Sequence, residues 1–311
     1  MKIVLRIIKI LLTGANGVVG SAIMRRLKTE PTIETVTITR TELDLLDEQA
    51  TSAYLERLKP EIVIGAAAVV GGIKANLGEP VRFLIENLAI QNNLMMASAR
   101  AGVSKYVFLA SSCIYPRLAP QPMTESALMT GPLEPTNESY AVAKLAGIQL
   151  ARSLQQEGRL KSIVLIPPNI YGPNDHFDLE RAHVLSSLIR RFTDAVLDGK
   201  KSINVWGSGK ARREFMHSDD LADAVLFLLH NSGAPFLVNV GVGDDISIRD
   251  AAQLIAEITE FSGEITFDPN QPEGMPQKLL NSSVMQQLGW HPRVALADGL
   301  TQLAAEYRSK I

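Results

Sequence analysis

Short apolar runs alternate with longer amphipathic stretches through the first half of the chain. The runs are rich in aliphatic and β-branched residues, which is typical of buried strands. The expected strands are 8–12, 35–39, 62–66, 106–110 and 162–166. The stretches between them carry apolar residues three and four positions apart, which predicts helices. The expected helices are 18–27, 47–58, 79–100 and 140–156. Repeated strand–helix units predict an α/β fold, a Rossmann-like doubly wound parallel sheet with helices on both faces.

The pattern loosens after Pro167, where Pro, Gly, Asn and Asp become frequent. It still predicts a helix over Leu221–Leu229, opened by Ser218, and a strand over Phe236–Val240. We therefore expect a large Rossmann domain and a smaller, discontinuous α/β lobe. The expected division is 1–168 plus 206–242 for the domain and 169–205 plus 243–311 for the lobe. The residues before about Ile7 form an extension on the first strand to which we assign no function.

Composition narrows the class of protein. Of 311 residues, 31 are Lys or Arg and 33 are Asp or Glu, so the formal net charge is −2. This balance argues against a dedicated nucleic-acid binder, which carries a basic excess. The one cysteine, Cys113, excludes an internal disulfide and a thiolate metal cage, and no metal-ligand spacing is present. Arg6 and Lys9 interrupt the apolar start, and no long apolar stretch follows, so we expect no membrane segment and a cytoplasmic protein.

A glycine-rich turn follows the first strand and opens the first helix. Gly14, Gly17 and Gly20 stand at the spacing that lets a backbone approach a pyrophosphate, with the helix N-terminus supplying free N–H groups. The turn also contains Asn16, Val18 and Val19. The strand–turn–helix context favours a dinucleotide site over a tight turn without a ligand.

The end of the second strand indicates which dinucleotide binds. Many NAD-binding proteins place an acid there for the ribose hydroxyls, whereas this chain has Arg40. A guanidinium suits a 2′-phosphate, so Arg40 favours NADP. A solvated surface arginine is the competing interpretation, and the nearby Glu42 is the rival acid for NAD.

Candidate chemistry comes from three residues in a fixed order. Tyr140 and Lys144 stand four apart on one helix face, where the ammonium is expected to lower the pKa of the phenol. Ser111 follows the fourth strand, at the carboxyl edge of the sheet where ligands bind in open α/β folds. The glycine turn, the serine and the Tyr-x-x-x-Lys pair are much more specific together than any one of them.

At this point the chain resembles the extended short-chain dehydrogenase/reductases and, within them, the GDP-L-fucose synthase family. The resemblance covers about Ile10 to Tyr307. The segments that carry it are 67–76, 111–116, 133–147, 168–173, 183–192, 205–209 and 213–215. The Ser-Ser-Cys-Ile-Tyr-Pro run and the His183 segment are specific to this family within the superfamily.

The resemblance implies two reactions at one site. GDP-4-keto-6-deoxy-D-mannose is epimerised at C3 and C5, and NADPH then reduces the C4 ketone to give GDP-L-fucose. By similarity, Cys113 is the base and His183 the acid, and both groups titrate near neutral pH. Tyr140 and Ser111 would hydrogen-bond the C4 oxygen, and Tyr140 would donate its proton during reduction. Lys144 would lower the pKa of that tyrosine and hold the nicotinamide ribose.

The resemblance also implies binding residues. The cofactor would contact Leu109, Ala110, Ser112, Pro167, Asn169, Ile170 and His183 in addition to the glycine turn, Arg40 and Lys144. The GDP-sugar would contact Arg191, Trp206, Arg213, Glu273 and Lys278. A solvated charge is the competing interpretation for each basic residue and the favoured one for Lys278, and core packing competes for Trp206. A homodimer through helices 79–100 and 140–156 is also implied.

Departures from the family pattern keep alternatives open. Asn16 stands where some members have an arginine for the 2′-phosphate, so selectivity for NADP would depend on Arg40 alone. Glu273 and Asn281 replace family acids near the substrate. A GDP-L-colitose synthase acting on the 3-deoxy analogue is therefore the main alternative. Another nucleotide-sugar epimerase or dehydratase that retains NAD is disfavoured by Arg40, and the dehydratase also because Ser112 and Cys113 stand where it would carry Asp-Glu. A non-catalytic NADP-sensing protein is disfavoured because Ser111, Tyr140 and Lys144 are all present.

Overall fold

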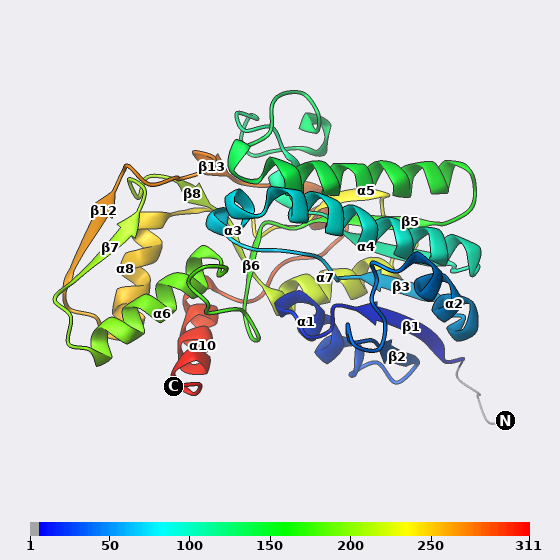
Figure 1. Ribbon diagram of the computed structural model, residues 1–311, viewed down its shortest axis with the longest axis horizontal. Helices are drawn as coiled ribbons and strands as arrows, with labels where there is room; N and C mark the ends of the chain where they lie inside the picture. The colour runs from blue at the N-terminus through cyan, green and yellow to red at the C-terminus, as the bar shows by residue number, and fades with distance from the viewer. Residues whose placement is uncertain (1–5) are drawn as a thin grey trace.

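A six-stranded parallel sheet forms the centre of the larger part of the molecule (Figure 1). This computed structural model describes residues 6–311. The sheet order is β10-β5-β4-β3-β1-β2, and every neighbouring pair is parallel. The strands are β1 (Ile8–Thr13), β2 (Ile33–Thr37), β3 (Ile62–Gly65), β4 (Lys105–Leu109), β5 (Ser162–Ile166) and β10 (Leu237–Asn239). The expected Rossmann-like sheet is confirmed. Because β1 lies between β2 and β3, the connection reverses direction there and opens a crevice at the carboxyl ends of β1 and β3.

Alternate residues of the central strands pack against helices on opposite faces of the sheet. Leu11 of β1 belongs to the cluster beneath α2 (Glu48–Leu58), α4 (Pro80–Arg100) and α5 (Glu138–Gln156). Its neighbours Ile10 and Leu12 belong to the cluster beneath α1 (Val18–Leu27) and α7 (Ser218–His230). Successive strand side chains point to opposite faces, so both faces are buried, and each fully buried Leu or Ile stabilises the fold by about 1.5–3 kcal/mol.

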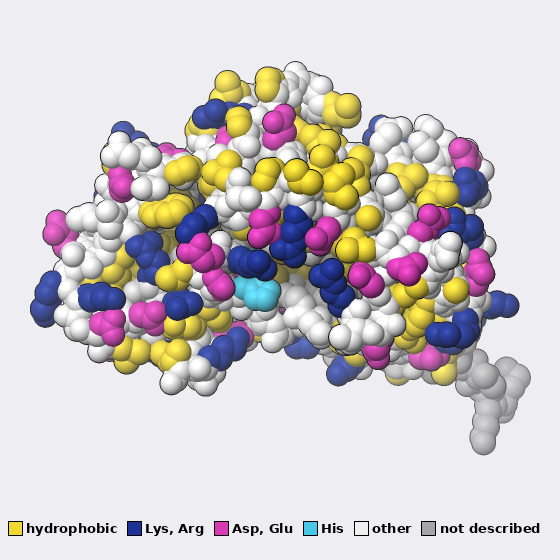
Figure 2. Space-filling model, in the orientation of Figure 1, with side chains coloured by type: hydrophobic (Ala, Val, Ile, Leu, Met, Phe, Trp, Pro, Cys, Tyr) yellow, Lys and Arg dark blue, Asp and Glu magenta, His cyan; other side chains and the backbone are white. Residues whose placement is uncertain are grey.

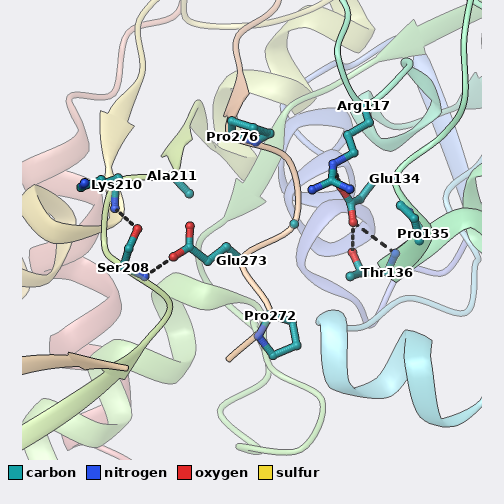
Figure 3. A pocket seen from close by; sticks show the side chains of 11 residues that line it. Arg117, Glu134, Pro135, Thr136, Ser208, Lys210, Ala211, Pro272, Glu273 and Pro276 are labelled. Carbon is teal, nitrogen blue, oxygen red and sulfur yellow. Dashed lines mark hydrogen bonds and ion pairs between the residues drawn. The ribbon is translucent and has the colours of Figure 1, made fainter. Parts of the chain in front are cut away.

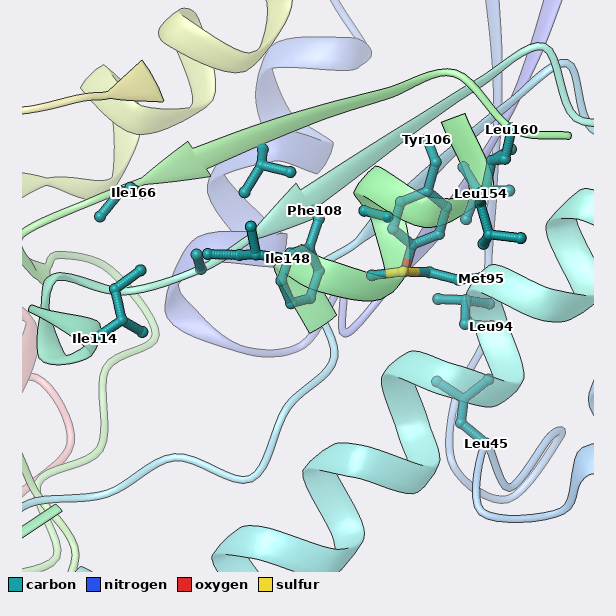
Figure 4. Close-up of a cluster of buried hydrophobic side chains, with 14 of the residues drawn as sticks. Leu45, Leu94, Met95, Tyr106, Phe108, Ile114, Ile148, Leu154, Leu160 and Ile166 are labelled. Carbon is teal, nitrogen blue, oxygen red and sulfur yellow. The ribbon is translucent and has the colours of Figure 1, made fainter. Parts of the chain in front are cut away.

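The α4 and α5 helices lie side by side over one face of the sheet (Figure 1). Figure 4 shows how they meet it: Met95 of α4 and Ile148 of α5 lie close to Tyr106 and Phe108 of β4. The observed boundaries of these helices fall within two residues of the expected ones. Their packing holds the start of α5, where Tyr140 stands, against the end of β4.

A smaller lobe forms from the segments after Asn169, at the left of Figure 1. Its core is built by α6 (Val184–Leu197), α8 (Ile248–Thr259) and α10 (Leu296–Arg308), with β7 (Ser202–Trp206) paired to β12 (Glu264–Asp268). None of these elements was predicted. The strands β7 and β12 have five residues each and leave little periodic signal, whereas α6 and α8 bury apolar residues three and four positions apart and carry a helical pattern that was available in the sequence.

Short elements connect the sheet to this lobe. They are α3 (Ile73–Gly78), β6 (Asn169–Tyr171), β8 (Arg212–Arg213), β9 (Phe215–His217), β11 (Ile246–Ser247), β13 (Gln277–Lys278) and α9 (Ser283–Gln287). Three 3₁₀ turns are η1 (Ser112–Ile114), η2 (Glu125–Ala127) and η3 (Pro135–Asn137). Strand β8 pairs with β13 and β11, and β6 pairs with β9, so residues far apart in sequence meet where the lobe joins the sheet.

Three local expectations need correction or delimitation. The second strand ends at Thr37, two residues before the expected end, so Arg40 lies in the following turn. The α7 helix begins at Ser218 but is capped by His217, whose Nδ1 atom accepts the backbone N–H of Asp219 at 3.3 Å. Residues 1–5 of the expected N-terminal extension lie outside the residues that the structure describes. Among residues 6–311, no helix is both long enough and apolar enough to cross a membrane.

Candidate functional site

A cavity of about 560 Å³ lies at the carboxyl edge of the sheet, between the sheet and the smaller lobe. Its walls come from the end of β4, the start of α5, the loop before α6, and β7, β8 and β13. The expected site residues that line it are Val18, Val19, Leu109, Ala110, Ser111, Cys113, Tyr140, Lys144, Pro167, Asn169, Ile170, His183, Arg191, Trp206, Arg213, Glu273 and Lys278. The fold thus brings residues from distant segments to one place.

The glycine turn has the shape that a pyrophosphate site requires. Gly14 has a φ of +70°, and a Cβ there would lie 2.7 Å from the backbone of Ala66 after β3. A Cβ on Gly20 would lie 2.0 Å from the carbonyl oxygen of Gly14, so the turn and α1 pack without room for a side chain. Gly17 caps α1 without a side-chain hydrogen bond, so the first N–H groups of the helix are available to an anion.

Glu42 and Arg40, the two candidates for contact with the ribose of the cofactor, differ in how the turn after β2 holds them. The Glu42 carboxylate accepts hydrogen bonds from the backbone N–H and the hydroxyl of Thr39, at 2.7 and 2.8 Å, and these bonds lower the pKa of Glu42. Glu42 therefore holds the turn. Arg40 is two-thirds exposed and has its Nε atom 4.0 Å from Asp44, so its guanidinium remains available to a phosphate. Neither residue lines the cavity; with Gly14, Asn16, Gly17 and Gly20 they lie beyond it.

Cys113 lies in the η1 turn directly after β4. Ser111 caps this turn: its Oγ atom accepts the backbone N–H of Cys113 at 3.3 Å. Ser112, which was expected to contact the cofactor, is buried and does not line the cavity. Its backbone N–H donates to the carbonyl oxygen of Pro167, a residue that does line it, at 2.9 Å. The Cys113 sulfur, by contrast, faces the cavity and is partly buried.

Tyr140 and Lys144 project from one face of α5 toward the end of β4. The Lys144 Nζ atom donates to the carbonyl oxygen of Leu109 at 2.9 Å and lies 5.7 Å from the centre of the Tyr140 ring. Burial, followed by the charge of Cys113, raises the pKa of Tyr140, against the lowering effect of its hydrogen bond with Ser111. The expected lowering by Lys144 is therefore wrong for this arrangement, because the ammonium lies over the ring rather than at the hydroxyl. Tyr140 stays protonated at neutral pH.

His183 is the residue before α6 and also lines the cavity. Burial lowers the pKa of His183, Asp175 acts against this, and Lys278 and His176 add to it. Asp175 is itself fixed, since its carboxylate accepts the Ser186 hydroxyl at 2.5 Å. Once protonated, an imidazole with a lowered pKa is a stronger acid than an ordinary histidine.

Besides Lys144, three cations line the cavity without a carboxylate partner among residues 6–311. Arg191 donates to the carbonyl of Asn204, and Arg213 donates at 2.7 Å to the carbonyl of Glu273. Lys278 is 8% exposed, so the favoured interpretation of a solvated charge is wrong. Trp206 is 47% exposed, which excludes a core packing role for it.

A second hollow of about 510 Å³ adjoins the cavity and is drawn in Figure 3. The Glu273 carboxylate accepts the backbone N–H of Ser208 there. Glu134 is 3% exposed, lies 3.2 Å from the Arg117 Nε atom and accepts from Thr136. Both Glu134 and Glu273 also line the main cavity, so the two hollows share a wall.

Sequence reasoning missed two polar residues of the site. Asn137 donates from Nδ2 to the Cys113 sulfur at 3.3 Å, and Glu134 carries a buried carboxylate between the two hollows. Both stand in the Leu133–Gly147 segment that carries the family resemblance, three and six residues before Tyr140. Their position in that segment was the available signal, since Asn and Glu directly before a helix usually indicate only a cap.

The chain is similar to known nucleotide-sugar enzymes over nearly its full length. The model of the NAD dependent epimerase/dehydratase family matches residues 10–241. GDP-L-fucose synthase 1 of Arabidopsis thaliana is 46% identical over 94% of this chain and 91% of its own length. GDP-L-fucose synthase of Escherichia coli is 42% identical, covering 94% of each chain. GDP-L-colitose synthase of Yersinia pseudotuberculosis is 38% identical, covering 94% of this chain and 96% of its own.

Solved structures agree. A GDP-6-OMe-4-keto-L-xylo-heptose reductase of Campylobacter jejuni superposes with a TM-score of 0.91 at 31% identity, covering 98% of this chain and 99% of its own. A GDP-L-fucose synthetase of Naegleria fowleri bound to NADP superposes with a TM-score of 0.89 at 27% identity, covering 98% of this chain and 95% of its own.

Proposed function

The chain belongs to the NAD dependent epimerase/dehydratase family and groups there with the GDP-L-fucose synthases, and from this membership we propose that it converts GDP-4-keto-6-deoxy-D-mannose to GDP-L-fucose. The observation that carries the proposal is that Ser111, Cys113, Tyr140 and His183 all face one cavity. An epimerisation beside a ketone needs a base and an acid near the same ring, and a reduction needs a proton donor at the ketone oxygen.

The residues present fit NADP. The glycine turn and the free N–H groups of α1 suit the pyrophosphate, and Arg40 suits the 2′-phosphate. Bound NADPH supplies the hydride for the C4 carbon. The residues that would hold it are Gly14, Asn16, Gly17, Val18, Val19, Gly20, Arg40, Leu109, Ala110, Ser112, Lys144, Pro167, Asn169, Ile170 and His183. Ser112 would act through its backbone, because its side chain is buried.

Cys113 and His183 would carry the epimerisation. The protons on C3 and C5 are both acidified by the C4 carbonyl, so a thiolate can remove each one and leave an enolate. The His183 imidazolium, with its lowered pKa, then returns a proton to the opposite ring face. The hydroxyls of Ser111 and Tyr140 would hydrogen-bond the developing charge on the C4 oxygen.

Tyr140 would donate the proton in the reduction. Its raised pKa keeps the phenol protonated until negative charge develops on the C4 oxygen and takes the proton. Lys144 would hold the nicotinamide ribose, since its ammonium is fixed by the carbonyl oxygen of Leu109 at the mouth of the cofactor site.

The charged wall of the cavity would hold the GDP group. Arg191 and Arg213 donate only to backbone carbonyls, so each retains donors for a diphosphate. Trp206 offers an exposed indole face for stacking, and Glu273 an acceptor at the hollow of Figure 3.

We include the domain division of 1–168 plus 206–242 and 169–205 plus 243–311 in this proposal. Three hydrophobic clusters support most of it, one on each sheet face and a third in the lobe, although Met275, Leu280, Met285 and Trp290 of the last segment pack into the sheet clusters. Ala211 and Phe215 belong to the third cluster, so the second segment of the NADP-binding domain also contributes to the lobe.

We further propose a cytoplasmic homodimer. A free catalytic thiol requires a reducing compartment, which supports the location. Val81 and Ile85 of α4 and Val142 of α5 are exposed large apolar side chains, and Figure 2 shows hydrophobic side chains gathered over the face where these helices lie. Such a patch on paired helices suits a symmetric contact.

One assay tests the activity. The protein is mixed with GDP-4-keto-6-deoxy-D-mannose and NADPH, nicotinamide absorbance is followed, and the product sugar is identified. Cys113→Ala should abolish solvent-deuterium exchange at C3 and C5, whereas Tyr140→Phe should mainly stop reduction. No NADPH oxidation with this substrate would reject the proposal, and turnover of the 3-deoxy analogue alone would replace it with the GDP-L-colitose synthase activity named for the Yersinia relative.

A further inference from the structure

Two polar donors converge on the sulfur of the only cysteine. Lys278 Nζ lies 3.4 Å from the Cys113 Sγ atom, and Asn137 Nδ2 lies 3.3 Å from it. The lysine comes from β13 and the asparagine from η3, so tertiary structure alone brings them together. A neutral thiol is a weak acceptor, whereas a thiolate accepts strongly from an ammonium and an amide.

Lys278 is buried where no carboxylate compensates its charge. It is 8% exposed and has no acidic partner among the residues that the structure describes. A buried ammonium without an anion is destabilising by several kcal/mol. The Cys113 sulfur is the group in contact with the ammonium that can become an anion, so ionisation of the thiol would compensate the lysine charge.

The backbone of Lys278 is held firmly enough to fix this pair. Lys278 pairs with Arg213 in the parallel β13–β8 register, and its carbonyl accepts the backbone N–H of Glu214 at 3.1 Å. Glu214 in turn accepts backbone N–H groups from Gly243 and Leu280 through its buried carboxylate. Hydrogen bonds at Lys278 itself and at Leu280 therefore fix the backbone around the lysine.

Other groups around the sulfur add one more cation and no closer anion. Arg213 from β8 acts electrostatically on Cys113, and Tyr140 from α5 faces it as a neutral phenol. The Ser111 hydroxyl accepts the backbone N–H of Cys113, and His183 faces Lys278 across the cavity. Glu134, a buried carboxylate that also lines the cavity, is already paired with Arg117.

We propose that Lys278 is a positioning residue that keeps the Cys113 sulfur ionised for proton abstraction, with Asn137 orienting it, rather than a ligand of the GDP phosphates. The inference rests on the proposed function for the role of Cys113 as base. In the step itself the carbon–hydrogen bond at C3 or C5 breaks, the proton binds sulfur, and the electron pair enters the enolate. The Lys278 charge favours the thiolate before this step and does not itself touch the substrate.

Thiol alkylation tests the inference without substrate. Because the chain has one cysteine, the rate of carbamidomethylation by iodoacetamide, read by intact mass against pH, reports on Cys113 alone. We expect Lys278→Met to raise the pH of half-maximal alkylation by about one unit or more and to slow alkylation at pH 7 about tenfold, since a charge this close shifts ionisation by about that much. Lys278→Arg should restore most of the rate.

Matched variants separate this role from general structural effects. Lys210→Met removes an exposed lysine at the rim of the adjoining hollow and should leave the alkylation profile unchanged. If Lys278→Met does not fold, Lys278→Gln removes the same charge and replaces it in the alkylation measurement. An unchanged profile in Lys278→Met or Lys278→Gln overturns the inference whether or not the protein turns over GDP-sugar.

A kinetic split gives the second readout. For deuterium exchange at C3 and C5, Lys278→Met should lower kcat with little change in KM, whereas Arg191→Met should mainly raise KM. A rise in KM alone for Lys278→Met would assign the lysine to the diphosphate and reject the thiolate role. Failure of exchange in the wild type would reject the proposed function, while the alkylation result would still decide the ionisation of Cys113.

Discussion

The ammonium of Lys144 donates a hydrogen bond to the carbonyl oxygen of Leu109, 2.9 Å away, and thereby fixes helix α5 to the end of strand β4. Burial lowers the pKa of Lys144 to about 8. The ammonium is thus charged at neutral pH, at the edge of the sheet where Tyr140 and the expected nicotinamide site meet. A buried cation with one carbonyl partner adds little to stability, so its chemistry is the better explanation for its presence.

Replacing Lys144 should separate chemistry from folding. We expect Lys144→Met to slow C4 reduction at least about 100-fold, because loss of the residue that would position the nicotinamide ribose misplaces the hydride by an amount worth about that much, while the circular dichroism spectrum stays unchanged. Stopped-flow absorbance of NADPH measures the step. Lys105→Met is the matched control, since Lys105 also donates to a backbone carbonyl, that of Leu229 at 3.2 Å, but at the other end of β4. Equal losses in both variants would contradict the assignment.

Arg40 should control the choice of cofactor. Its guanidinium is two-thirds exposed after β2, while the rival Glu42 is engaged by Thr39. We expect Arg40→Ala to raise the KM for NADPH about tenfold and to leave the KM for NADH nearly unchanged, because only NADPH carries the 2′-phosphate. Steady-state kinetics with both cofactors measures this. Arg57→Ala removes an exposed arginine of α2 and should change neither KM; a parallel rise for NADH in Arg40→Ala would argue against a phosphate contact.

The parts of the site differ in how far the local sequence determines them. The glycine turn and the Tyr140–Lys144 face could be predicted because each lies within one strand–helix unit. Lys278 could not be placed, because its burial depends on the pairing of β13 with β8, across more than sixty positions of intervening chain. The same holds for its contact with Cys113, where the two residues are 165 positions apart. Trp206 could be placed locally, because it lies on the face of β7 opposite the buried Ile203 and Val205, an alternation that the sequence itself carries.

Glu214 should make stability depend on pH. Burial raises its pKa to about 7, against the lowering effect of the N–H groups of Gly243, Leu280 and Val242. The ordinary value is 4.5, so the folded chain binds this proton more tightly than the unfolded chain does. The contribution to stability is therefore fully present below about pH 4.5 and is lost as the pH rises through about 7, by an amount on the order of 3 kcal/mol.

Urea denaturation at pH 5.0 and 7.5 checks this dependence. Glu214→Gln cannot titrate, so the stability of wild type minus that of the variant should fall between the two pH values. Other shifted groups, such as Asp220, cancel in this difference. Glu264→Gln replaces an exposed glutamate of β12 and should give a difference that does not change with pH. A constant difference for Glu214→Gln as well would show that its carboxyl titrates alike in both states.

The exposed apolar side chains of α4 should hold two chains together. Val81 is 72% exposed and Ile85 55% exposed, one helical turn apart, and Val142 of α5 is 42% exposed. Side chains of this size at such exposure are unusual on two adjacent helices of a monomer. We expect sedimentation velocity to give twice the chain mass of 33.9 kDa for the wild type, and one chain mass for the double variant Val81→Asp/Ile85→Asp.

A matched pair of substitutions tests whether the position or merely the added charge matters. Leu118 is 81% exposed in the segment between η1 and α5, and Leu197 is 68% exposed at the end of α6, so neither side chain belongs to α4 or α5. The double variant Leu118→Asp/Leu197→Asp adds the same charge and should remain a dimer. Because Tyr140 and Lys144, which we propose to act in the reaction, stand on α5, the monomeric variant should also lose part of its activity in proportion to the loosening of that helix. Dissociation of both double variants, or of neither, would place the interface elsewhere.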